Sequence, residues 1–397
     1  MKTAILQVAD TGPLESLVVM LRAAGYDCYL PNEQLRGQLR GWGLDTVLDI
    51  NNLVRGWGYE QPFELPFAGP EMLNRCDLYV DIKAHRNGPL LWKHVPRLKD
   101  RTLWYRINGG KPEHVRKNCI CVAAINEHTL DVCRAADLKP CDPSDLPHCE
   151  GCFCVVKCED HGDEVNPPCP VLTPNQWYAQ IPDSSLRDAT DIAEQIERKI
   201  LYATRAYACW PPFVRFGDYA DKWPRSVYTS PVCLIHNLTG WGYGRIVDGI
   251  RALGVRCWGN GSPDGLVKHD EIPCHLSGAL AMVHLKSSDA PGYALYEALA
   301  AKCPIICTRR LIWRCRMQEL LIPGETCLVF DRETHDGLND ADVADCLREV
   351  SGHLAALRDP ALNRRIGEAG YERLKQVMWR EDRDGPTLVE FMQRNFP

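Results

Sequence analysis

The chain has 397 residues, of which 45% are hydrophobic and 25% are charged, an ordinary globular balance that leaves room for two domains. Its net charge of -6 argues against a protein that coats nucleic acid or anionic membrane without specificity. The first residues hold one lysine and a short apolar run, then Asp10 and Glu15, which indicates a strand rather than a signal peptide. Because no apolar run approaches the roughly 20 residues that span a bilayer, we expect a soluble cytoplasmic protein without a transmembrane segment.

The N-terminal part alternates strands and helices. Five short apolar runs predict strands, at residues 3–8, 27–30, 78–82, 102–107 and 119–123. The turn that opens the first helix contains Gly12, Asp81 lies near the end of the third strand, and Asn108 follows the fourth. Such alternation predicts a parallel sheet, and an ordinary Rossmann-like loop remains the alternative interpretation of Gly12.

Residues 36–60 are rich in glycine, and the triplet Arg-Gly-Trp occurs twice, ending at Trp42 and Trp57. An exposed tryptophan beside an arginine can stack on bases or sugars. The alternative is a tryptophan that covers the edge of the core.

The segment from Lys83 to Lys117 is basic, with ten lysines and arginines, among them Arg86, against two acidic residues. Histidines, His85 included, and aromatics such as Trp104 lie between them. Basic residues interleaved with aromatics suit a polyanionic ligand, whereas routine solvated surface charge is the alternative.

Residues 137–170 differ in composition from the rest of the chain, because they are rich in Pro, Asp and Cys and show little helical or strand periodicity. The whole chain has 20 cysteines, most of which we interpret as small buried hydrophobes or metal ligands. The spacing Cys149-x-x-Cys152 is typical of a tetrahedral zinc site, and Cys158 or His161 could complete it. The candidate ligands are Cys149, Cys152, Cys154 and Cys158. Disulfides and free thiols are the alternatives, since a second CxxC is missing.

A strand is predicted at residues 170–173 and a long amphipathic helix at 188–207. Residues 210–231 are rich in proline and aromatics without a period, which indicates a linker between domains. The next strand, at residues 232–236, leads through a loop with Gly240 and Gly242 into a helix that begins near Arg245. A Gly-rich loop before a helix N-terminus can hold a phosphate.

The most informative stretch is residues 279–308, which read as strand, turn, helix and strand. Asp289 lies in the turn, Gly292 ends it, and Glu297 lies inside an otherwise apolar helix, where an acidic side chain is costly without a partner. A generic βαβ turn with a solvated Asp289 is the alternative interpretation.

This pattern resembles the donor-site signature of retaining GT-B glycosyltransferases, with Asp289 in place of the usual glutamate. The resemblance implies an α/β protein of GT-B fold, with two Rossmann-like domains facing across a cleft and a Cys-rich insertion in the first. Its divisions would be an acceptor-binding domain at 1–209 with the insertion at about 137–170, a linker at 210–231, a nucleotide-sugar-binding domain at 232–376, and a segment at 377–397 that returns to the first domain.

The resemblance also implies the donor site. Glu297 would bind the ribose of a nucleotide sugar, a UDP-sugar such as UDP-glucose, and Asp289 and the turn amides would face the sugar. Arg245 would hold the diphosphate without an obligatory divalent ion. The implied donor-binding residues are Gly240, Gly242, Arg245, Asp289, Gly292, Tyr293, Glu297 and Arg310.

For the acceptor we expect contacts from Gly12, Trp57, Arg86, Trp104 and Asn108, and for a catalytic base Asp81, with His85 second. The acceptor that best suits the basic segment is 5-hydroxymethylcytosine in DNA, as in phage DNA glucosyltransferases acting in the host cytoplasm. One alternative is a cytosolic transferase with a lipid-linked or polysaccharide acceptor. The other is a non-catalytic module that binds a nucleotide sugar or nucleic acid.

Overall fold

The computed structural model describes residues 2–8, 11–44, 65–82, 84–106, 121–124, 206–225, 230–235, 243–259, 261–286, 292–315, 317–331 and 339–396. The chain divides into two compact units. Among the described residues, the first unit takes the chain up to Phe213 together with Trp379 and the residues after it, and the second takes Val214–Met378.

The first unit is built on a parallel sheet of seven strands, in the order β3-β2-β1-β4-β5-β6-β7. Its strands are β1 Lys2–Gln7, β2 Tyr26–Pro31, β3 Phe67–Ala68, β4 Leu78–Asp81, β5 Thr102–Arg106, β6 Cys121–Ala124 and β7 Ala206–Cys209. Its helices are α1 Thr11–Ala23, α2 Glu33–Gly41, α4 Pro70–Leu73, α5 Ala84–His94, the 3-10 turn η1 Pro96–Arg101, and α15 Glu381–Asn395.

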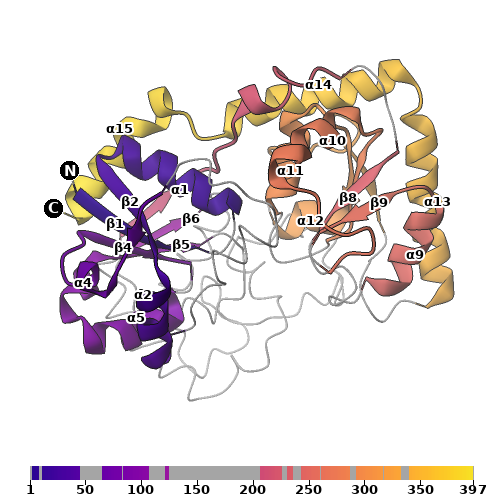
Figure 1. Cartoon of the computed structure of the whole chain (residues 1–397). Coiled ribbons are helices and arrows are strands. Elements are labelled where there is room, and N and C mark those ends of the chain that lie inside the picture. The colour runs from indigo at the N-terminus through magenta and orange to yellow at the C-terminus, as the bar shows by residue number, and fades with distance from the viewer. Residues whose placement is uncertain are drawn as a thin grey trace, which may run out of the picture. The chain divides into compact units, whose positions relative to one another are not determined.

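Helices cover both faces of this sheet, as parallel strands require. Figure 1 shows α1 and α15 on one side and α2, α4 and α5 on the other. Leu35, Leu39 and Leu91 from the second group pack against Ile5 and Tyr79 of the strands. The C-terminal helix α15 lies beside α1, so the last residues of the chain complete the layer over the first strands.

The second unit is a parallel sheet of five strands, in the order β12-β11-β10-β8-β9. Its strands are β8 Val232–Leu234, β9 Arg256–Trp258, β10 Met282–His284, β11 Ile305–Thr308 and β12 Cys327–Phe330. Its helices are the turn η5 Phe216–Asp218, α9 Gly244–Ala252, the turn η6 His269–Glu271, α10 Ile272–Gly278, α11 Tyr293–Ala300, α12 Arg309–Arg314, α13 Asp340–Ala356 and α14 Pro360–Val377.

Alternate residues of each strand in the second unit serve different cores, because successive side chains point to opposite faces. Val283 and Ile306 join the cluster that α9 and α13 complete. Met282 and Ile305 join the cluster formed with α11 and α14. The sheet is therefore buried on both faces.

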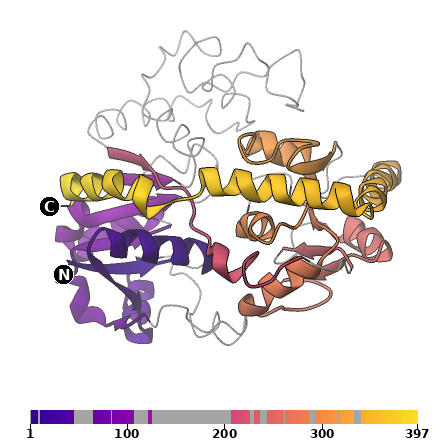
Figure 2. The same ribbon diagram turned by 90° about the horizontal axis from the view of Figure 1, so that it is seen from above.

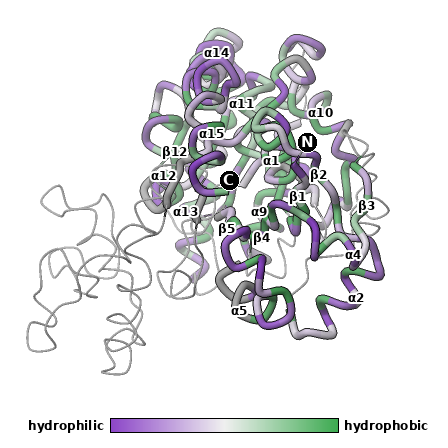
Figure 3. The backbone as a smooth tube through the Cα atoms, turned by 90° about the vertical axis from the view of Figure 1, so that its left-hand side faces the viewer, coloured by the Kyte–Doolittle hydropathy of each residue, from purple (hydrophilic) through white to green (hydrophobic). Residues whose placement is uncertain are grey.

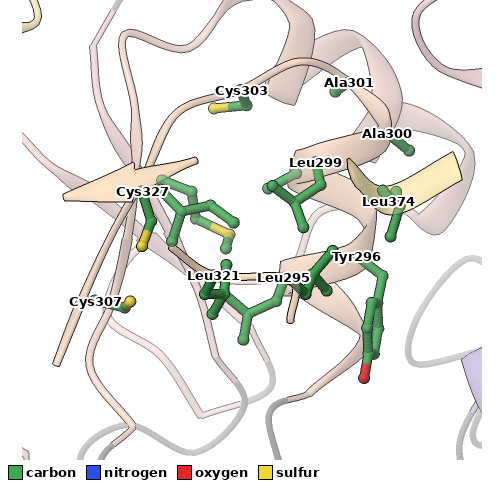
Figure 4. Packing of buried hydrophobic residues seen from close by; sticks show 14 of the residues in the cluster. Leu295, Tyr296, Leu299, Ala300, Ala301, Cys303, Cys307, Leu321, Cys327 and Leu374 are labelled. Carbon is green, nitrogen blue, oxygen red and sulfur yellow. The ribbon is translucent and has the colours of Figure 1, made fainter. Parts of the chain in front are cut away.

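Helix α11 is the centre of the second cluster, and every residue from Leu295 to Ala300 is buried. Figure 4 shows Leu295 and Leu299 pointing toward Leu321, Cys327 and Cys307, with Leu374 of α14 alongside. Seen from above in Figure 2, α14 lies across this unit as one long helix. Glycines allow this approach, because a Cβ on Gly367 would lie 2.1 Å from the carbonyl oxygen of Lys302.

The hydropathy of the chain follows this layering. Figure 3 shows hydrophobic residues along β1 and β4, whereas hydrophilic residues concentrate on helices such as α2 and α14. Ten cysteines of the described chain are free and nine of these are buried, which confirms the interpretation as small hydrophobes for these residues. Burial raises the pKa of Cys76 to about 11 and that of Cys346 to about 12. In the described ranges no helix combines the length and apolar character needed to span a membrane.

The structure corrects one predicted element. The sequence pattern predicts Tyr207 on a helix at residues 188–207, but Tyr207 lies in β7 and pairs with Val122 of β6. Two further helices follow from local signals. Residues 33–41 form helix α2, capped by Asn32, because a cap side chain and leucines at helical spacing outweigh the glycines. Helix α15 begins at Glu381, and its acidic first turn suits a helix N-terminus.

The approach of α14 to the end of α11 gives a test of the fold. Gly367→Ala should lower the free energy of unfolding by about 2 kcal/mol or more, because the new methyl group overlaps the Lys302 carbonyl and the backbone must move. The measurement is urea denaturation. The matched control is Gly352→Ala in α13, where nothing lies within 4 Å, and alanine should instead stabilise the helix by up to about 1 kcal/mol. Equal effects of the two substitutions would mean that α14 does not approach α11 as closely as described.

Candidate functional site

The strand order of the second unit contains a topological switch point. The chain goes from β8 to β9 on one side, and then to β10 on the other side of β8. In open parallel sheets ligands bind beyond the carboxyl ends of the strands at such a point. A ligand is therefore expected beyond the carboxyl ends of β8 and β10, where helices α9 and α11 begin.

Glu297 is a buried acid next to this point, with 8% of the residue exposed. The hydroxyl of Tyr219 donates a hydrogen bond of 3.1 Å to its Oε1, and Nε2 of His269 lies 3.0 Å from the same oxygen. Tyr219 directly follows η5, and His269 is the first residue of η6. Two segments outside α11 therefore fix the carboxylate. No described residue donates to the second oxygen, Oε2, which leaves an acceptor for a ligand hydroxyl.

The N-terminus of α11 is built on Gly292. This residue has φ 76° and ψ 142°, a backbone conformation that glycine adopts without strain, and no side chain of the described residues caps the helix. Free amides and the helix dipole at such an end favour an anion. Tyr293, the first residue of α11, is half-buried and its ring meets that of Tyr296 edge to face.

His284 ends β10 beneath this helix start. It is 1% exposed, and both of its ring nitrogens are buried without a hydrogen-bond partner from any described residue. A Cβ built on Gly292 would lie 3.8 Å from the Cε1 atom of His284. Burial, with a smaller effect of Lys286, lowers the pKa of His284 to about 3, so its imidazole is neutral.

Two arginines stand at the carboxyl edge of the sheet. Arg245 lies in the first turn of α9, where it is half-exposed and forms an ion pair with Asp340 of α13. Arg310 lies in the first turn of α12, directly after β11. Both positions supply positive charge near the edge where a ligand of a parallel sheet binds.

Comparison with known proteins agrees with this geometry. Residues 244–380 match a family model described as glycosyl transferase-like. This part of the chain, from the first residue of α9 to just beyond the end of α14, is similar to that family. Comparison with curated protein sequences gives no match.

The likeness to solved structures extends over nearly the whole chain. Anabaena HepE in complex with UDP and glucose superposes with a TM-score of 0.55 at 10% identity, covering 99% of this chain and 98% of that one. HepE in complex with UDP-glucose gives the same TM-score, 0.55, at 9% identity and the same coverage of 99% and 98%. Sucrose-phosphate synthase from Thermosynechococcus elongatus gives 0.47 at 12% identity, covering 100% and 99%. The likeness to HepE confirms the expected GT-B fold of two parallel-sheet α/β domains. The family match of residues 244–380 agrees with the expected glycosyltransferase activity.

In the first unit the structure places Asp81 and Trp104 in the core. Asp81 is fully buried at the end of β4 and accepts a 2.8 Å hydrogen bond from Nδ2 of Asn87 in α5. Its role as a base stays a prediction. Trp104 is 1% exposed and its indole nitrogen donates to the carbonyl oxygen of Ile82. The ring therefore packs in the core, and its contact with an acceptor stays a prediction.

The remaining predicted residues are only partly described. Gly12 lies in the first turn of α1, and His85 and Arg86 lie in the first turn of α5, but their side-chain surroundings are outside the described residues. Trp42, which ends the first Arg-Gly-Trp triplet, stacks on His94 with ring centroids 4.3 Å apart. This contact agrees with a tryptophan that covers the edge of the core. The residues that lie wholly outside the described part of the chain are Trp57, Asn108, Cys149, Cys152, Cys154, Cys158, Gly240, Gly242 and Asp289.

Sequence reasoning missed three residues of this site, Tyr219, His269 and His284. A partner for Glu297 was expected from the cost of burying a carboxylate, but Tyr219 and His269 lie 78 and 28 residues away. His284 could have been noticed as a polar residue in an otherwise apolar strand. Its lack of partners was visible only in three dimensions.

The buried neutral imidazole gives a pH test. The pKa of His284 is about 3 in the folded protein and about 6.5 in the unfolded chain, so below pH 6.5 the unfolded state binds the extra proton. Stability from this residue is present above pH 6.5 and falls as the pH drops, by about 2 kcal/mol between pH 7 and pH 5.

The measurement is the unfolding free energy of the protein and of His284→Leu at pH 7 and pH 5. The variant should lose about 2 kcal/mol less over this interval, while all other histidines contribute equally to both proteins. An identical loss in the two proteins would show that His284 is not buried in the neutral form.

Proposed function

We propose that the chain is a retaining glycosyltransferase that moves a sugar from a nucleotide-sugar donor to a hydroxyl acceptor, with the donor bound by the second unit. The observation that carries this proposal is the carboxylate of Glu297, which is fixed through Oε1 by Tyr219 and His269 and keeps Oε2 for a ligand. A carboxylate oxygen accepts hydrogen bonds only, so it matches the hydroxyl donors of a ribose.

The diphosphate of the donor would lie at the N-terminus of α11, about 7.5 Å from Glu297 along the helix axis at 1.5 Å per residue. Amides at Gly292 and Tyr293 and the helix dipole favour the negative charge that grows on the leaving diphosphate. Arg245 and Arg310 supply further positive charge, and Gly240, Gly242 and Asp289 join the site by the family resemblance. This arrangement calls for no obligatory divalent ion.

A uridine nucleotide is the proposed donor base. The support is that HepE, which shares the fold, was crystallised with UDP-glucose and with UDP. With retention of the anomeric configuration, the leaving phosphate can take the acceptor proton, so a protein base is not essential. Asp81, or second His85, is the base we propose if one acts.

The proposed acceptor is 5-hydroxymethylcytosine in DNA, in an enzyme of phage origin that works in the host cytoplasm. The support is the basic segment from Lys83 to Lys117. The residues proposed to contact the acceptor are Gly12, Trp57, Arg86, Trp104 and Asn108. A lipid-linked or polysaccharide acceptor is the alternative within the same enzyme class. A structural zinc at Cys149, Cys152, Cys154 and Cys158 would fold the Cys-rich segment and take no part in the transfer.

The donor site is tested by Glu297→Gln. Loss of the charge and of one acceptor oxygen should raise the dissociation constant of UDP at least about tenfold, since a hydrogen bond to a charged group contributes about 1.5–3 kcal/mol. The measurement is calorimetric titration with UDP. Glu325→Gln, an exposed glutamate in a turn of the same unit, is the control and should leave the constant unchanged. Unchanged affinity in Glu297→Gln rejects the site.

The acceptor is tested by transfer assays read by mass spectrometry. UDP-glucose is offered with duplex DNA containing 5-hydroxymethylcytosine and with the same duplex unmodified, and we expect a mass gain of one hexose on the modified DNA alone. Transfer to a polysaccharide or lipid-linked acceptor instead would select the alternative enzyme. Binding of UDP-glucose with neither transfer nor hydrolysis would identify a non-catalytic module.

A further inference from the structure

The side chain of His284 is a polar group at the switch point of the second unit that the donor site described so far leaves unused. Both ring nitrogens are closed to solvent and have no hydrogen-bond partner in the described part of the chain. A buried donor or acceptor without a partner costs free energy, and folded proteins keep few of them. Such a group in a binding site calls for a ligand that completes its hydrogen bonds.

The position of the ring restricts which part of a ligand it can meet. Its Cε1 atom, which lies between the two nitrogens, is the side-chain atom nearest to a Cβ built on Gly292, at 3.8 Å. The nitrogen-bearing edge therefore faces the residue that opens α11. Because residue 292 is a glycine, it places no side chain of its own between the imidazole and the helix N-terminus.

The order of the groups in a nucleotide sugar then indicates which of them lies near His284. With the ribose at Glu297 and the diphosphate at the N-terminus of α11, the next group along the donor lies beyond the helix start, on the side of β10. The base lies at the opposite end of the donor. His284 is thus on the side of the diphosphate and the sugar.

The chemistry of the ring distinguishes these two groups. A neutral imidazole has one N–H donor and one nitrogen acceptor. A diphosphate offers acceptors only, so it would leave the acceptor nitrogen opposite negative oxygens. A sugar hydroxyl both donates and accepts, so it can pair with either ring nitrogen, whichever of the two carries the proton.

We infer that His284 contacts a hydroxyl of the donor sugar through its imidazole, from beneath Gly292. The inference rests on the proposed function and deepens it, because it assigns a sugar-contacting residue that the sequence pattern did not contain. Its role is recognition of the sugar, and the diphosphate and ribose are bound by other groups.

The test compares the dissociation constants of UDP and UDP-glucose in the wild-type protein, in His284→Leu and in the control Met282→Leu. We expect His284→Leu to weaken UDP-glucose about tenfold, the usual effect of losing one or two hydrogen bonds, and to change UDP less than twofold. Met282→Leu, a volume-conserving change in the same strand, should alter neither constant. An equal change for both ligands, or no change for either, overturns the inference and leaves the proposed function standing.

A measurement on the wild-type protein covers the case in which His284→Leu does not fold. The side-chain nitrogens of ¹⁵N-histidine-labelled protein are followed by NMR, with His284 assigned as the resonance that stays neutral at pH 5. UDP-glucose should shift this resonance and UDP should not. A shift with UDP alone, or with neither ligand although both bind, contradicts the inference. If the wild-type protein binds neither UDP nor UDP-glucose, the proposed function is wrong and the inference falls with it.

Discussion

A carboxylate inside an apolar helix is the constraint around which the second unit is arranged. Every residue of α11 from Leu295 to Ala300 is buried, so the charge of Glu297 cannot reach bulk water by rotation of the side chain alone. Tyr219 and His269 compensate by holding one oxygen. The segments around η5 and η6 must therefore pack against α11. Because Oε1 is held by both partners, the direction of Oε2 is fixed as well.

The surroundings of α11 explain why the helix can carry this charge. It is enclosed by the sheet on one side and by α14 on the other, and Gly367 and Gly370 let α14 approach closely. Rigid packing of this kind keeps a functional side chain in one position, so the site is already arranged for its ligand before binding. The same packing places Gly292 and His284 at a defined edge of the sheet, where the polar groups of the site meet.

The sequence predicts those helices and strands that are determined by a local pattern of residues. The strand, helix and strand predicted within residues 279–308 correspond to β10, α11 and β11, because apolar runs and Gly or Pro breaks are local signals. Strand β7 was missed because Tyr207 also continued a helical period, and only its pairing with β6 in the sheet fixes it as a strand. The burial of Trp104 and the partners of Glu297 and His284 depend on residues distant in sequence, which no local pattern reveals.

The most direct test of the account is a crystal structure of the protein with UDP bound. The account predicts a ribose hydroxyl within about 3 Å of Oε2 of Glu297, with Oε1 still held by Tyr219 and His269 and the diphosphate at the N-terminus of α11. A carboxylate turned away from the nucleotide, or UDP bound elsewhere on the chain, would contradict it.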